Sequence, residues 1–265
     1  MTDYNNYYKM DEEQTLYNTA HLVLIEIVSY LIGENKTLFS LIMSCKKFAQ
    51  KRHIFLKGCV FDSLKSKLLY KKQPKYWNHV HTLSLRECPD ITNVSALGHV
   101  HRLYLYNCQN IRDVSALVQV HTLTLYNCDN ITDVSALGQV HTLDLSNCKK
   151  ITDVSALGQV HTLTLSFCQK ITDVSALGHV HTLYLYNCQN ITDVSALGQV
   201  HTLYISNCQN ITDVSALGYV HTLILECCEN ITDVSALGHI HTLKLSWCQN
   251  ITDVSALKNV KNLIR

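Results

Sequence analysis

The sequence of 265 residues predicts an α/β solenoid with a parallel β-sheet on its concave face, preceded by a small helical domain. Three observations support this fold class. A unit of 20 residues, VHTLTLYNCDNITDVSALGQ at 120–139, recurs nine times with little change between Val80 and Asn259. Each unit opens with alternating apolar and polar residues, which is the period of a β-strand. Residues 1–79 lack the unit and place apolar residues at helical spacing.

The repeat sets the expected domain boundary. Residues 1–79 should form the helical domain and N-terminal cap, and residues 80–265 should form nine units plus a partial tenth. Apolar spacing predicts helices from Leu22 to Leu31, from Leu38 to Phe48 and from Phe55 to Tyr70.

Each unit should form one turn of the solenoid. Leu123 and Leu125 alternate with polar residues and are expected to face the interior. In the DVSAL segment that follows, Asp133 can cap a short helical turn that returns Val134 and Leu137 to the same interior. Strands about 4.8 Å apart would give a parallel sheet on the order of 40 Å long.

When the units are aligned, the residues at one position of every unit form a column. Two columns carry further structural information. The glycine column contains Val118 in the second unit, so this position should not require a positive φ angle. At the carboxyl end, Lys258 replaces glycine and Lys261 replaces histidine, which puts charge on an otherwise exposed edge and predicts a modest cap.

The pattern V-x-x-L-x-L-x-x-C-x-x-I resembles the leucine-rich repeat. The segment CDNITD at 128–133 is similar to its cysteine-containing type, although a unit of 20 residues is shorter than that type usually has. The resemblance covers about two thirds of the chain. It implies a solenoid that binds another protein on its concave face.

The charge balance argues against a general nucleic-acid or membrane-surface binder, because 22 basic residues stand against 21 acidic ones. The N-terminal segment is polar and acidic, unlike a secretory signal. The longest apolar run, Leu22 to Ile32, contains Glu26 and is shorter than the roughly 20 residues that span a bilayer. We therefore expect a cytoplasmic protein with no membrane or nucleic-acid partner.

One segment is strongly basic, although the chain as a whole is nearly neutral. Between Lys46 and Lys75 there are ten basic residues and one acidic residue, Asp62. The run could contact phosphates, but no recognition helix or aromatic platform accompanies it. A solvated helix face with possible adaptor contacts is the favoured interpretation.

The cysteine column invites a metal-binding interpretation. Nine of the 12 cysteines, from Cys88 to Cys248, occupy one position of the repeat. A stacked column presents thiols in a line and lacks the second pair of ligands that a tetrahedral zinc site needs. We expect reduced thiols that turn inward and pack as small apolar groups, with no metal.

Histidines and aspartates also form columns. Nine histidines with equivalent neighbours, His81 through His241, indicate a structural or solvent-facing role, since catalysis needs one histidine with unique neighbours. A weak metal site remains an alternative where His99, His179 or His239 precedes another histidine by two residues. The aspartate column is interpreted as caps, because the glycine-rich repeat of calcium coils is absent. We expect no cofactor.

The positions that differ between units point out of the predicted sheet, and many are aromatic. Such side chains anchor protein interfaces, so we predict a partner-binding concave face. The alternative is that duplicated copies drifted at tolerant positions. The predicted partner-binding residues are Tyr104, Tyr106, Tyr126, Phe167, Tyr184, Tyr186, Tyr204 and Trp247.

The N-terminal segments VLIEIVSYL at 23–31 and LFSLIMSCKKF at 38–48 resemble the F-box. This chain has Thr19 and Ala20 where that family usually has leucine and proline. The resemblance implies docking to the adaptor subunit of a cullin-type ubiquitin ligase. The residues at the matching positions are Ile27, Tyr30, Leu31, Cys45 and Phe48.

An F-box followed by cysteine-containing leucine-rich repeats implies a substrate receptor of a cullin-type ubiquitin ligase. The alternative is a plain interaction scaffold whose N-terminal helices serve only as a cap. Neither function is enzymatic, and the sequence has no Gly-rich phosphate loop, nucleophile elbow or unique acid-base constellation. The near-identical copies resemble repeat families of giant DNA viruses, which would place the protein in the host cytoplasm.

Overall fold

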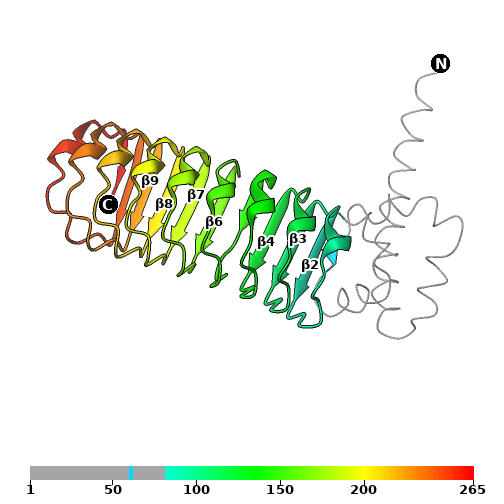
Figure 1. Cartoon of the computed structure of the whole chain (residues 1–265). Coiled ribbons are helices and arrows are strands. Elements are labelled where there is room, and N and C mark those ends of the chain that lie inside the picture. Colours follow the sequence, from blue (N-terminus) through cyan, green and yellow to red (C-terminus); the bar gives the residue numbers. More distant parts are fainter. Residues whose placement is uncertain (1–59, 62–80) are drawn as a thin grey trace, which may run out of the picture.

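The structure is a computed structural model that describes residues 60–61 and 81–265. In this part of the chain, eleven strands form one parallel sheet in sequence order, from β1 to β11. Within the repeat region, each strand except the last is followed by a short 3₁₀ helix on the other side of the stack (Figure 1). The predicted solenoid of 20-residue turns is therefore confirmed.

The strands begin at the third position of each unit, where threonine and leucine alternate with the variable residues. Parallel pairing joins the same position of neighbouring units, for example Leu183 with Leu203. Residues at the same position of successive units therefore lie side by side in a row across the sheet. The strands are β1 Val60–Phe61, β2 Thr82–Arg86, β3 Arg102–Tyr106, β4 Thr122–Tyr126, β5 Thr142–Asp144, β6 Thr162–Ser166, β7 Thr182–Tyr186, β8 Thr202–Ser206, β9 Thr222–Glu226, β10 Thr242–Ser246 and β11 Asn262–Ile264.

The helical turns are short 3₁₀ helices, as the five residues of DVSAL predict. Asp133 Oδ1 accepts the Ser135 N–H at 2.9 Å. Asp133 lies one residue before the N-cap residue Val134, which makes no side-chain cap bond, so the aspartate closes an Asx-turn ahead of the helix. The helices are η2 Ser95–Leu97, η3 Ser115–Leu117, η4 Ser135–Gln139, η5 Ser155–Leu157, η6 Ser175–His179, η7 Ser195–Gln199, η8 Ser215–Tyr219, η9 Ser235–His239 and η10 Ser255–Asn259.

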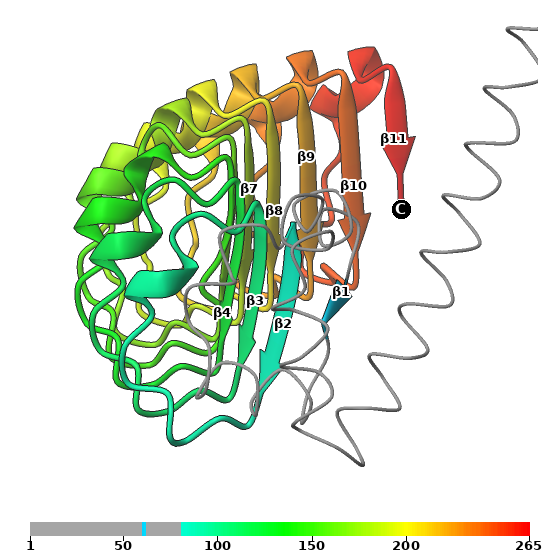
Figure 2. The same cartoon turned by 90° about the vertical axis from the view of Figure 1, so that its right-hand side faces the viewer.

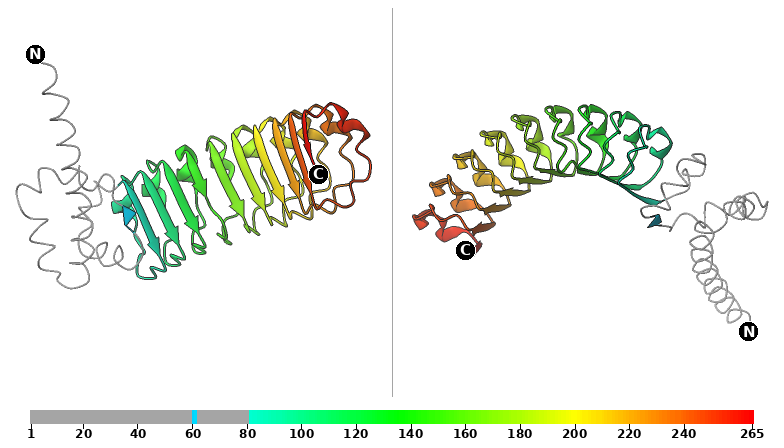
Figure 3. Two further views of the ribbon diagram at one scale, coloured as in Figure 1. Left: turned by 180° about the vertical axis from the view of Figure 1, so that it is seen from behind. Right: turned by 90° about the horizontal axis from the view of Figure 1, so that it is seen from below.

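The core is a continuous apolar stack inside the turns. Leu123, Leu125 and Leu137 are fully buried, and Val134 is nearly so, as the alternation predicted. Viewed along the solenoid, the strands form one wall and the 3₁₀ helices the opposite one (Figure 2). Seen from below, the sheet follows the inner side of an arc and the helices its outer side (Figure 3). The sheet therefore lines the concave face.

The cysteine column faces this core, which confirms the predicted inward packing. Cys168 is fully buried, and its Sγ donates to the carbonyl oxygen of Leu145, in the preceding unit, at 3.2 Å. Cys128 makes the equivalent contact with Leu105 at 3.6 Å. Burial raises the pKa of Cys168 to about 12, so the thiol stays protonated and binds as a donor.

Close packing between units favours glycine in its column, which Val118 occupies in the second unit. None of the described glycines has a positive φ, and Gly98 and Val118 both adopt right-handed helical conformations, as expected. A β-carbon at Gly198 would lie 2.4 Å from the carbonyl oxygen of Ala216 in the next unit. The limit is therefore steric contact with a neighbouring backbone.

The position that does adopt the left-handed conformation was not predicted from the sequence. It is the eighth residue of each unit, where the strand ends, and it is most often asparagine, as at Asn107 with φ 56°. Asparagine tolerates this conformation. Its side chain also bonds along the stack, with Asn127 Nδ2 donating to Asn107 Oδ1 at 2.6 Å.

The helix predicted from Phe55 to Tyr70 is wrong at two residues. Val60 and Phe61 form β1, which pairs in parallel with β2. The unpaired edge of the first repeat strand offers backbone hydrogen bonds that override the local helical pattern. The other predicted helical residues lie outside the described part of the chain.

The predicted adaptor-binding residues, Ile27, Tyr30, Leu31, Cys45 and Phe48, all lie outside the described residues. At the carboxyl end, the segment after Lys258 continues the sheet as β11, whose residues are exposed. Among the described residues, no helix has the length and apolar character needed to cross a membrane.

Candidate functional site

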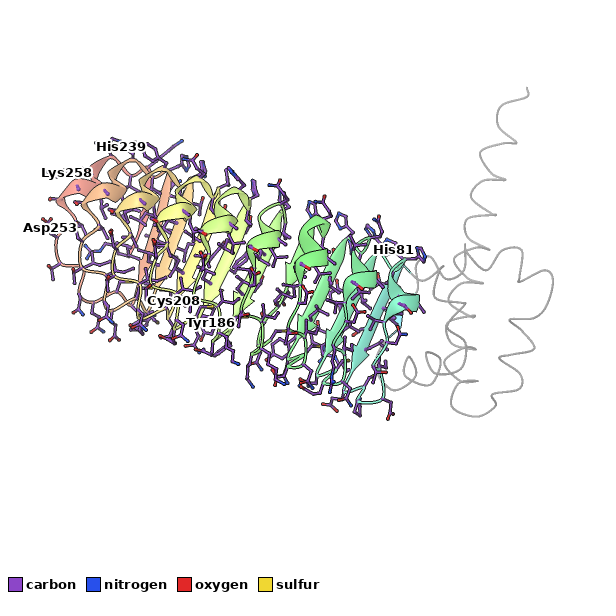
Figure 4. All side chains as sticks on the ribbon, in the orientation of Figure 1. His81, Tyr186, Cys208, His239, Asp253 and Lys258 are labelled. Atoms are coloured by element: carbon purple, nitrogen blue, oxygen red, sulfur yellow. The ribbon has the colours of Figure 1, made fainter. Side chains whose placement is uncertain are left out.

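The concave sheet face presents the variable positions of the repeat, five and seven, to solvent. Tyr126 and Tyr186 are 43% and 42% exposed, and Phe167, at position eight, is 40% exposed. Tyr104, Tyr106, Tyr184 and Tyr204 are half-buried against neighbouring rows. Tyr186 lies near the carboxyl end of its strand (Figure 4). The predicted aromatic residues of positions five and seven thus share one face.

Three tyrosines and one arginine form the N-terminal aromatic cluster, defined as Arg86, Tyr104, Tyr106 and Tyr126. The Tyr106 ring centroid lies 6.5 Å from that of Tyr104 and 6.1 Å from that of Tyr126. The Arg86 guanidinium carbon lies 4.1 Å from the Tyr106 centroid, a cation–π contact. Arg102 begins the next strand and is exposed. This end of the face is aromatic and cationic.

A second group, the central aromatic cluster, consists of Phe167, Tyr184, Tyr186 and Tyr204. Tyr184 and Tyr204 are paired across β7 and β8, and their rings stack at 4.4 Å with planes 17° apart. Phe167 meets Tyr186 edge to face at 5.0 Å. Burial raises the pKa of the Tyr184 phenol, with a smaller contribution from Tyr204. The raised pKa and the short distances between ring centroids indicate that these rings are neutral and closely packed.

Trp247 does not join either cluster. It occupies the eighth position of the ninth unit, in the left-handed conformation with φ 55°, and is 72% exposed. Phe167 has the same position and conformation in the fifth unit. The predicted set of eight residues is therefore divided into two clusters and one separate tryptophan.

The two clusters are separated by a break in the fourth unit. Strand β5 ends at Asp144, whose Oδ1 accepts the Ser146 N–H at 2.8 Å and also the Ser146 hydroxyl. Ser146 folds into the surface and is only 7% exposed. Leu145 still donates its N–H to the Thr164 carbonyl oxygen at 3.0 Å, so the core row continues. The signal for this turn was the Asp-x-Ser sequence, which the sequence analysis did not use.

The histidine column lies along the edge where strands begin. Adjacent imidazoles contact each other from His81 to His241 and are stacked from His121 onward. The Nδ1 of most rings is hydrogen-bonded to the Oγ1 of the following threonine, at 3.2 Å for His161. His81 and His239 mark this edge in Figure 4. Equivalent neighbours along the row agree with the expected structural role.

The aspartates of the repeat close Asx-turns ahead of the 3₁₀ helices. Asp133 is fully exposed, and hydrogen bonds from Ser135 hold the pKa of its carboxyl below the usual value. Within residues 81–265, no three histidine, cysteine or acidic side chains are grouped closely enough to hold a metal ion. The chemistry available on this solenoid is therefore dominated by the exposed aromatic face.

The comparison with protein families gives one match. Residues 239–258 match the family model described as Leucine Rich repeat. These residues are the last residue of the eighth unit and nearly all of the ninth, and closely similar sequences recur in the other units. No curated protein sequence matches the chain.

Several solved structures are similar to the solenoid. Internalin C2 from Listeria monocytogenes is 26% identical, with a TM-score of 0.49, and the alignment covers 72% of this chain and 82% of that one. An internalin, inlF, from the same organism is 22% identical, with a TM-score of 0.45 and coverage of 71% and 68%. The functional domain of InlJ from Listeria monocytogenes, which includes a cysteine ladder, is 20% identical, with a TM-score of 0.34 and coverage of 71% and 53%.

Proposed function

We propose that this protein is a non-enzymatic interaction protein that binds a polypeptide partner across its concave sheet face. The observation that carries the proposal is the pair of aromatic clusters on that face. Buried and turn positions are nearly the same in every unit, whereas the outward positions of the sheet vary and collect tyrosine. Partly exposed tyrosine, tryptophan and arginine are the side chains that contribute most to protein interfaces.

The two clusters favour different parts of a partner. Arg86 and Arg102 make the N-terminal cluster suited to acidic side chains, while the neutral central cluster is suited to apolar or aromatic ones. Tyr126 and Tyr186 lie three units apart, which is about 14 Å at the usual strand spacing. About four to five extended residues span that distance. A single extended segment with an acidic end and an apolar end therefore fits both clusters.

The first test removes the stacked pair of the central cluster. The double variant Tyr184→Ser and Tyr204→Ser is expected to lose captured partners in cross-linking pull-downs followed by mass spectrometry. The loss of one stacked pair should lower the free energy of unfolding by only about 1 kcal/mol, because both rings lie on the surface of the sheet. Urea denaturation monitored by circular dichroism gives that control value.

Tyr219→Ser is the matched control. Tyr219 is 85% exposed, but it ends η8 and lies away from the sheet face. This variant should retain the partners of the natural protein. An identical set of captured proteins for all three chains would contradict binding at the central cluster.

We further propose, on the F-box resemblance of residues 19–60, that the protein is a cytoplasmic substrate receptor of a cullin-type ubiquitin ligase. In this role, the N-terminal region binds the adaptor subunit and the concave face binds the target. The support is the order of the two sequence resemblances along one chain. The competing proposal keeps the interaction face and assigns the N-terminal helices only a capping role.

The variant Leu31→Asp separates these roles. A carboxylate on the apolar surface of the resembling segment should weaken co-purification of the adaptor at least about tenfold, since burying an unpaired charge is strongly unfavourable. The solenoid should keep its circular dichroism spectrum. Adaptor binding that is unchanged by Leu31→Asp would remove this interface, and a natural chain that binds no adaptor would favour the capping role.

A further inference from the structure

A continuous row of nine imidazoles lies along the edge of the solenoid where the strands begin, and we call it the histidine ladder. Neighbouring ring centroids are 4.5 to 4.7 Å apart over the whole row. From His121 onward, neighbouring ring planes are within 14° of parallel. Its members are His81, His101, His121, His141, His161, His181, His201, His221 and His241.

The surroundings of the ladder offer no negative charge to compensate protonation. The two residues on either side of each described ladder histidine include no aspartate or glutamate. The charged groups that act on the rings are neighbouring histidines, Arg102 beside His101 and Lys261 beside His241. His99, His179 and His239 lie on the same edge, at the ends of the preceding turns. Apart from the phenol of Tyr219, which stands at the same repeat position as these three histidines, the ionisable groups named here are basic.

Eight of the nine rings make a hydrogen bond that survives protonation, whereas protonation does not strengthen the stacking. In these eight, Nδ1 lies 3.1 to 3.3 Å from the Oγ1 of the following threonine, and a hydroxyl can accept from a charged ring as well as donate to a neutral one. His101 is followed by Arg102. Two imidazoliums at the spacing of the ladder repel each other. Acidification therefore weakens the ring contacts between units and leaves the hydrogen bonds within each unit in place.

We propose that the histidine ladder is an acid-sensitive device, in which protonation loads one edge of the solenoid with like charge and weakens the contacts between its turns. The device is independent of the proposed function and of the identity of any partner. It acts on one edge only. The opposite edge is joined mainly by asparagine and glutamine bonds, such as Gln189 Nε2 to the Asn207 carbonyl oxygen at 2.6 Å, and its ion pair, Lys149 with Asp129, joins opposite charges.

The direction of the effect follows from the two protonation states. Burial, and then the neighbouring histidines, lower the pKa of His161 and His201 below the ordinary 6.5. The unfolded chain consequently binds more protons below pH 6.5, so stability is complete above that pH and is lost as the pH falls through the folded values. Serine hydrogen bonds lower the pKa of the capping carboxyls, such as Asp193, from 3.8, so their contribution is lost only in stronger acid.

The experiment compares the melting temperature at about pH 7.5 and about pH 5.0 in three full-length chains, a range that isolates histidine titration. The ladder variant carries His141→Gln, His181→Gln and His221→Gln. It removes three of nine rings but six of the eight ring contacts. The control variant removes the same number of histidines from outside the ladder. It carries His99→Gln, His179→Gln and His239→Gln.

We expect the natural chain and the control variant to lose at least about 4 °C on acidification, and the ladder variant to lose less than half of that. Using the difference between two pH values removes any effect of the substitutions on absolute stability. Equal losses in the two variants would show independent titration and overturn the proposal, as would the absence of an acid-induced loss in the natural chain.

Nuclear magnetic resonance of the natural chain provides a second measurement that needs no variant. Coupled rings should titrate over a broad pH range with a Hill coefficient below one, because each proton disfavours the next. Sharp, independent titration of His161 and His201 near pH 6.5 would contradict the device even if the ladder variant failed to fold.

Discussion

Replacing Leu183 with alanine is expected to lower the free energy of unfolding by about 2 to 5 kcal/mol. Leu183 is fully buried in the row of leucines at the second residue of each repeat strand, between Leu163 and Leu203 of the neighbouring units. Its truncation leaves a cavity that both neighbours share. Because each turn of a solenoid contacts only adjacent turns, the loss should be concentrated in the middle of the stack. Urea denaturation and amide hydrogen exchange would measure its size and location.

Leu263 supplies the matched comparison. It occupies the same column in β11 but is 37% exposed. Leu263→Ala should cost less than about 1 kcal/mol, because a surface truncation forms no cavity. Similar losses for Leu183→Ala and Leu263→Ala would mean that burial in this row does not govern stability.

The second large effect is expected for Gly198→Val, at about 2 kcal/mol or more. A β-carbon at Gly198 would lie 2.4 Å from the Ala216 carbonyl oxygen, and that atom belongs to the backbone of the next turn. Relief therefore requires two turns to move apart. Thermal unfolding of the purified variant gives the measurement.

Val118 tests whether the steric explanation is right. The second unit already carries a β-carbon in the glycine column, with φ at −55°. Val118→Ala should therefore change stability by less than about 1 kcal/mol. If Gly198→Val is tolerated as well as Val118→Ala, the contact with the next turn is not what excludes side chains from this column.

The sequence by itself determined the period, the strand positions and the core. Val134, Leu137 and the strand leucines were predicted to be inside because alternation and turn length leave no other apolar face, and the structure buries them. The cysteine prediction succeeded for the same reason. A residue that repeats every 20 positions meets its own copies at one strand spacing, so in-register pairing turns a column into a row.

Tertiary structure alone decided how the rows interact. The stacking of the histidines and of Tyr184 on Tyr204 depends on side-chain orientation, which residue spacing does not specify. The steric role of Gly198 needed the position of a carbonyl oxygen 18 residues later. The short strand β1 appeared because the edge of the first repeat supplies backbone partners for Val60 and Phe61. Period and burial follow from local chemistry, whereas contacts between turns are fixed only when the turns are stacked.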